Sequence, residues 1–267
     1  MLLTLGLLLT ACNVNGTSPA HPAVGDIAAS QQSAAANAAQ TFRSVDDFNV
    51  QYRELVDYIG SANLPRQLTQ VDLKTHRKVS QYTDIDSSPS GYGKDACGLV
   101  AAAAALGGEN WVPLVAAIAQ AAGDRYQPLS GIQPSNFVAA LGQTFGAINV
   151  RALDQGSLGN LYRELAAGNI VIVDVKLNDA RGVPSANPPN LAHFARVLGF
   201  DVDQQVIYLE NTVGGSAYWT VQLSDFWAAW QQPETSASLI LDQRHAEDVT
   251  RWAVVIAGKL VVAKRSG

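Results

Sequence analysis

The stretch from Asp95 to Gly108 reads DACGLVAAAAALGG and places Cys97 where a helix of small residues would begin. Free backbone N–H groups and the positive end of the helix dipole favour the thiolate there, and the thiolate is the nucleophilic form of cysteine. The same stretch also fits a structural cysteine, because free cysteine is among the most buried residue types. The stretch alone leaves both interpretations of Cys97 open.

A cysteine nucleophile needs a base and a polar group that orients the base. Of the four histidines, His21 lies in the N-terminal stretch that we expect to be a tether, and His76 and His245 lie among charged or loop-like residues that are typical of a surface. His193 instead starts an apolar strand segment directly after a loop rich in proline and asparagine. Asn211 ends the next strand segment, QVIYLEN, and pairing of the two strands would bring their ends together. Asn211 is therefore a candidate for orienting His193, although an ordinary turn residue is the other interpretation.

Several elements must position these residues. A helix is predicted from Ser44 to Gly60, and a loop rich in Asp, Ser, Pro and Gly, Asp84–Gly93, leads to the cysteine. Helices are predicted next at Pro113–Ala122, from Pro134 to Phe145 and at Leu158–Ala167, and strands at Ala147–Leu153 and Asn169–Leu177. An antiparallel meander follows at Ala192–Asp201, Gln205–Asn211 and Ala217–Leu223, and then a helix capped by Ser224.

The order of the elements, helices first and an antiparallel sheet after them, predicts an α+β fold with the N-terminal helices packed on the sheet. We assign residues 42–267 to this domain and treat residues 232–267 as an uncertain C-terminal extension. Within it, Trp252–Ala257 and Lys259–Ala263 fit a strand pair or a helix and a strand.

Composition limits the possible partners. The 267 residues are 48% hydrophobic and 15% charged with a formal net charge of −5, and no Lys/Arg cluster is present. Nucleic-acid binding needs a concentrated basic face, so we expect none. We also expect neither a metal ion nor a cofactor.

The N-terminal run MLLTLGLLLTAC is too short to span a bilayer and is typical of a secretory signal. Its end, Leu9–Cys12, is similar to the lipobox of bacterial lipoproteins, which implies a signal peptide at residues 1–12 and a lipid on Cys12. Residues 13–41 are rich in Ala, Ser and Gln and predict a flexible tether. We expect an exported protein, anchored in a membrane and facing the extracytoplasmic side, in which Cys97 is the remaining thiol.

From about Tyr82 to Gln231 the sequence resembles the C39-like branch of the papain-like cysteine peptidases. DACGLVAAAAALGG is similar to the nucleophile segment of that family, and HFARVLGFDVDQQVIYLENT to its histidine strand and the strand that follows. GIQPSNFVAAL, LYRELAAGNIVIVDV and WTVQLSDFWAAW match the intervening and closing segments. The resemblance implies a papain-like fold with Cys97 as nucleophile, His193 as base and Asn211 as orienting residue.

Two departures from the family pattern bear on the chemistry. Asn-Thr stands where Asp-Pro is usual, and asparagine serves the same role in papain-like enzymes. Gly91 stands where the family commonly has a glutamine that binds the oxyanion. The oxyanion hole would then depend on backbone N–H groups near Cys97, with Tyr92 or Ser90 as further candidates.

We therefore expect an extracytoplasmic cysteine peptidase that hydrolyses peptide amide bonds through a Cys-His-Asn triad. One alternative is a catalytically inactive papain-like module that binds peptides at the cell envelope. Another is a cell-wall peptide hydrolase of the NlpC/P60 type, although the Cys-Ser-Gly of that type is absent here.

Overall fold

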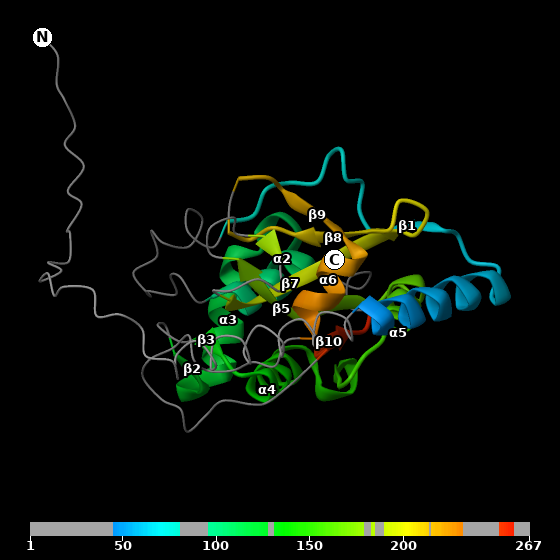
Figure 1. Ribbon diagram of the computed structural model, residues 1–267. Helices are drawn as coiled ribbons and strands as arrows, with labels where there is room; N and C mark the ends of the chain where they lie inside the picture. The colour runs from blue at the N-terminus through cyan, green and yellow to red at the C-terminus, as the bar shows by residue number, and fades with distance from the viewer. Residues whose placement is uncertain are drawn as a thin grey trace, which may run out of the picture. The chain divides into compact units, whose positions relative to one another are not determined.

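Helices and an antiparallel sheet build the part of the chain that the computed structural model describes (Figure 1). The described residues are 45–80, 96–127, 131–178, 183–184, 190–213, 215–231 and 251–258. Residues 44–267 form one compact unit. The α+β prediction is confirmed, whereas the predicted signal peptide and tether lie outside the described residues.

The helices follow the sequence signals closely. The first covers residues 45–61. The others are α2 (Cys97–Gly107), α3 (Val112–Ala122), α4 (Pro134–Phe145), α5 (Leu158–Ala166) and α6 (Leu223–Trp230). Pro113 and Pro134 lie in the first turns of their helices, where the missing N–H is tolerated. Within the described ranges no helix is both long and apolar enough to cross a membrane.

The predicted cap of the last helix is wrong. Strand β9 runs directly into α6, so the residue before the helix is Gln222, with extended backbone, and Ser224 already lies in the first turn. Helix α5, by contrast, begins with a full capping box, in which Ser157 and Asn160 satisfy each other's backbone N–H groups.

The main sheet has the order β4-β10-β5-β7-β8-β9, with every pair antiparallel. Its strands are β4 (Val150–Leu153), β5 (Ile170–Asn178), β7 (Asn190–Asp201), β8 (Val206–Glu210), β9 (Tyr218–Gln222) and β10 (Ala253–Ile256). Strand β1 (Gln67–Thr69) adds to β7, and β6 (Val183–Pro184) adds to β5. Strands β2 (Tyr126–Gln127) and β3 (Gly131–Ile132) form a separate pair. The predicted meander corresponds to β7, β8 and β9.

Strand β10, from the C-terminal extension, lies inside the sheet between β4 and β5. Its four residues are all buried. The sequence offered a strand here as one of two options, but its central position was not predicted. Strand β4 is shorter than predicted, because residues 147–149 form a 3₁₀ turn.

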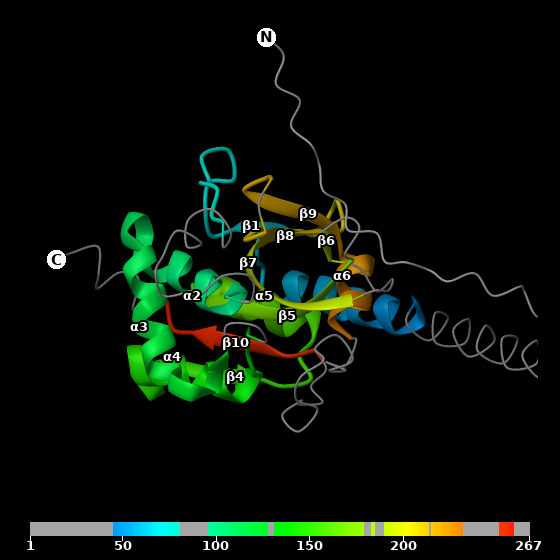
Figure 2. The same cartoon turned by 90° about the vertical axis from the view of Figure 1, so that its left-hand side faces the viewer.

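The two faces of the sheet are covered by different helices (Figure 2). Side chains alternate between the faces along a strand. On β5, Ile170 and Ile172 pack in the cluster that contains the buried residues of α2, α3 and α4. Val171, Val173 and Val175 pack in the cluster that contains residues of the first helix, α5 and α6. We call these two sides the α2 face and the α6 face.

Candidate active site

Cys97 is the first residue of α2 and lies on the α2 face. The first intrahelical hydrogen bond runs from Val100 N–H to Ala96 O (2.9 Å), so the N–H groups of residues 97–99 lie at the open end of the helix. Cys97 as a residue is 9% exposed, and Phe194 N–H on β7 donates to Cys97 Sγ at 3.5 Å. The sulfur therefore lies among backbone donors that would stabilise a thiolate or an oxyanion.

Small residues let α2 approach the sheet this closely. A Cβ at Gly98 would come within 2.9 Å of Phe194 Cδ2. The alanines from Ala101 to Ala105 are all buried. A bulkier side chain next to the cysteine would thus push the helix, and the sulfur with it, away from β7.

His193 lies next to Phe194 on β7 but points to the α6 face. Its partner on β5 is Val175, which belongs to the core of that face. The imidazole lies edge-on to the ring of Trp219, with centroids 5.6 Å apart, and Nε2 is 3.3 Å from Thr212 Oγ1. Burial lowers the pKa of His193 to about 3, so the ring is neutral at physiological pH.

Asn211 organises the turn between β8 and β9. Its Oδ1 accepts from Val213 N–H at 2.9 Å, and its Nδ2 donates to Ser216 Oγ at 3.3 Å. The contact to the His193 ring nitrogen comes from the next residue, Thr212. Pairing of β7 with β8 brings the ends of the two strands close together, but the prediction named Asn211 as the residue that orients His193, and the side chain that reaches His193 Nε2 is that of Thr212.

The structure does not bring Cys97 and His193 together. The backbone N–H of Phe194 hydrogen-bonds to the sulfur, and the Phe194 ring packs under α2. Because neighbouring residues on a strand point to opposite faces, the side chain of His193 points away from Cys97. Tyr92 and Ser90, the predicted oxyanion candidates, and Cys12, the predicted lipid site, lie outside the described residues. The backbone N–H of Cys97 remains as an oxyanion candidate at the start of α2.

Four buried charged residues, which the sequence analysis missed, share the α2 face with Cys97. Asp174 and Lys176 lie on β5, Arg196 on β7 and Glu210 on β8, and each is at most 9% exposed. Asp174 lies opposite Phe194 in the register of β5 with β7, and Phe194 is the residue whose backbone N–H hydrogen-bonds to Cys97 Sγ. The sequence does contain a sign of two of these four residues. In the apolar run IVIVDVKLN, Asp174 and Lys176 stand two positions apart, which places both on the same face of a strand.

The arrangement supplies a thiol, backbone donors and ionisable side chains on one face, which are groups that acyl transfer uses. Among the described residues, no group of three or more His, Cys, Asp or Glu side chains is placed to hold a metal ion.

Among solved structures, the chain is similar to a crystal structure described below. No family model and no curated protein matches the sequence. The crystal structure is of a protein from Bacillus anthracis that bears the provisional name of C39-like peptidase. It is 14% identical over 71% of this chain and 96% of that chain, with a TM-score of 0.45. A likeness of this size does not assign the chain to a family, so the functional argument depends on the geometry of the site.

Proposed function

We propose that the protein is a cysteine peptidase in which Cys97 attacks the carbonyl carbon of a peptide amide. The observation that supports it is the place of the sulfur, at the open start of α2 and bonded to Phe194 N–H. Thiolate attack would form a tetrahedral oxyanion, which the N–H groups at the start of α2 would stabilise. Loss of the amine gives a thioester on Cys97, and water then hydrolyses it to the acid.

His193 is the proposed base, and Asn211 the proposed orienting residue. In the arrangement described above the imidazole is neutral and held on the α6 face by Thr212 and Trp219. Proton transfer with Cys97 therefore requires the start of β7 to turn residue 193 to the α2 face when substrate binds. We propose this turn as the activating step, with the described arrangement as the resting one.

The second candidate is a module that binds peptides without cleaving them. The separation of Cys97 from His193 across the sheet favours it, because the proposed base does not reach the thiol in the described arrangement. The two candidates make opposite predictions for a single experiment.

The experiment measures turnover of a broad peptide library by the purified chain and by the Cys97→Ala variant. We expect cleavage by the wild type and none by Cys97→Ala, with His193→Gln lowering kcat at least a hundredfold. Circular dichroism confirms that each variant is folded. If wild type and Cys97→Ala give the same product profile while the thiol titrates as reduced, the peptidase proposal is wrong and the binding module replaces it.

We also propose that the protein is exported and anchored in a membrane through Cys12. Support comes from the apolar N-terminal run and from the lipobox-like residues Leu9–Cys12. A substrate on the extracytoplasmic side, such as a peptide of the cell envelope, is consistent with this location.

A further inference from the structure

The turn between β8 and β9 holds Thr212 in a fixed place. Asn211 N–H donates to Ala217 O at 3.2 Å and closes the turn. Inside the turn, Val213 N–H donates to Asn211 Oδ1, and Asn211 Nδ2 donates to Ser216 Oγ. Asn211 is 3% exposed and Thr212 is 0% exposed. Thr212 is therefore buried between two residues whose backbone N–H groups are both bonded within the turn.

The side chain of Thr212 reaches the candidate base. Its Oγ1 lies 3.3 Å from His193 Nε2, and the contact is buried. A hydroxyl can donate to a ring nitrogen or accept from it, so the tautomer of the ring decides which of the two atoms is the donor. Trp219 on β9 adds the edge-on contact to the ring. Both contacts come from the β8–β9 hairpin, so this hairpin fixes the imidazole on the α6 face.

The hydroxyl of Thr212 favours this position of the imidazole over others. A buried ring nitrogen without a hydrogen-bond partner is costly. Valine at position 212 would keep the shape of the side chain but would leave Nε2 of His193 unpaired where it now lies. An imidazole that had left the α6 face would not have this cost. The hydroxyl therefore changes the balance between two positions of the imidazole and not only the stability of the turn.

We propose that Thr212 is a positioning residue that keeps His193 away from Cys97 until substrate binds. The inference rests on the proposed function, in which His193 turns to the α2 face and takes the proton of the thiol. Thr212 is the group that opposes this turn. Loss of its hydroxyl shifts the imidazole toward the α2 face, where proton transfer from Cys97 to the ring leaves a thiolate beside an imidazolium. The expected consequence is a more reactive thiol.

The rate at which iodoacetamide alkylates Cys97 at pH 7 tests the proposal on the full chain. Mass spectrometry of the peptide that contains Cys97 measures this rate, so that reaction at Cys12 is not counted. We expect Thr212→Val to raise the rate about threefold or more, and Thr212→Ser, which keeps a hydroxyl, to stay within about twofold of wild type. The increase should vanish when Thr212→Val is combined with His193→Gln, because it depends on the imidazole.

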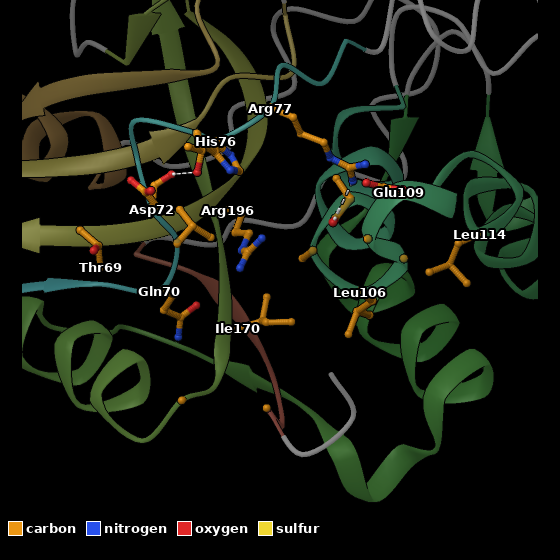
Figure 3. Close-up of a pocket in the computed structure, with 18 of the residues that line it drawn as sticks. Thr69, Gln70, Asp72, His76, Arg77, Leu106, Glu109, Leu114, Ile170 and Arg196 are labelled. Atoms are coloured by element: carbon orange, nitrogen blue, oxygen red, sulfur yellow. Dashed lines mark hydrogen bonds between the residues drawn. The ribbon is translucent and has the colours of Figure 1, made fainter. Parts of the chain in front are cut away.

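A matched control makes the same substitution far from His193. Thr69 is exposed on β1 and lines a cavity of about 1220 Å³ at the C-terminal end of α2 (Figure 3). Its partner Gly199 lies six residues along β7 from His193, which is about 20 Å at 3.3 Å per residue. Thr69→Val should alkylate as the wild type does. Thr212→Ala covers the case in which Thr212→Val does not fold, because alanine also lacks the hydroxyl and takes less space. It should raise the rate as valine does.

Three results in variants that circular dichroism shows to be folded would each overturn the proposal. They are a wild-type rate in Thr212→Val or Thr212→Ala, an equal increase in Thr212→Ser or Thr69→Val, and an increase that persists in the double variant with His193→Gln. The last would mean that the change loosens the protein around the thiol without any part played by the imidazole.

The readout needs no peptide substrate, so this proposal and the proposed function can fail separately. If the thiol responds as expected and no peptide is cleaved, the peptidase proposal is wrong and Thr212 still controls the position of His193. If peptides are cleaved and the thiol does not respond, Thr212 has no such role and the peptidase proposal stands.

Discussion

Acid should destabilise this protein through His193. The folded state holds the imidazole neutral with a pKa of about 3, whereas the unfolded chain has the ordinary value of 6.5. The unfolded state therefore binds a proton that the folded state refuses, and the free energy of unfolding falls as the pH drops below 6.5. With these two values, stability falls by about 2 kcal/mol between pH 8 and pH 5 because of this one residue.

Urea unfolding at pH 8 and pH 5 measures the effect in wild type and in His193→Gln, which keeps a polar partner for Thr212. The loss of stability on acidification should be smaller by about 2 kcal/mol in His193→Gln than in wild type. His76→Gln, which removes the other histidine of the described residues, is the matched control and should keep the part of the loss due to His193. An equal acid-dependent loss in wild type and His193→Gln would refute the reasoning. It would mean that the folded protein accepts a proton on the imidazole as readily as the unfolded chain does, which a ring buried on the α6 face should not do.

Three further predictions concern packing, the thiol and the N-terminus. Gly98→Ala should destabilise the fold by about 1–3 kcal/mol in urea, because the new methyl meets Phe194 at 2.9 Å; Gly60→Ala, with open space around it, should not destabilise. Alkylation of resting Cys97 by iodoacetamide at pH 7 should slow severalfold in Lys176→Met, which removes a cation from the same face, and stay within twofold in His193→Gln. Cys12→Ala should move the protein from the membrane fraction to the soluble fraction; a membrane-bound Cys12→Ala product would contradict the lipid anchor.

Local patterns in the sequence were sufficient for most elements. Pro113 and Pro134 marked helix starts, and the apolar run IVIVDV gave the buried strand β5. Strands β1 and β10 were harder, because each is short and its partners lie far away in the chain. For β10, the residues AVVI carry no sign that they pair with β4 and β5, about 100 and 80 residues earlier. Such a position depends on tertiary packing and not on local propensity.

The candidate site shows a different limit. The order of β7 and β8 was enough to predict that the ends of the two strands lie close together, but the prediction named Asn211 where Thr212 makes the contact to His193 Nε2. The face of the sheet to which His193 points was not predictable in the same way. A shift of one residue in the register of a strand moves every side chain of that strand to the other face. Phe194 and not His193 packs under α2, and that choice follows from the fit of its ring against Gly98 and Phe137. Spacing along the sequence contains no information about this fit.

The charges under α2 distinguish this face of the sheet from the α6 face. A strand buried on both faces is normally a continuous apolar run, and an apolar side chain in place of a buried charge is often neutral or stabilising. Among the described residues, the buried Asp, Lys, Arg and Glu side chains all lie on the α2 face. Asp174 and Lys176 lie toward the Cys97 end of α2, and Arg196 and Glu210 lie toward its C-terminal end. The α6 face, by contrast, carries no buried Asp, Lys, Arg or Glu side chain among the described residues, so the two faces of the sheet differ in chemistry and not only in the helices that cover them.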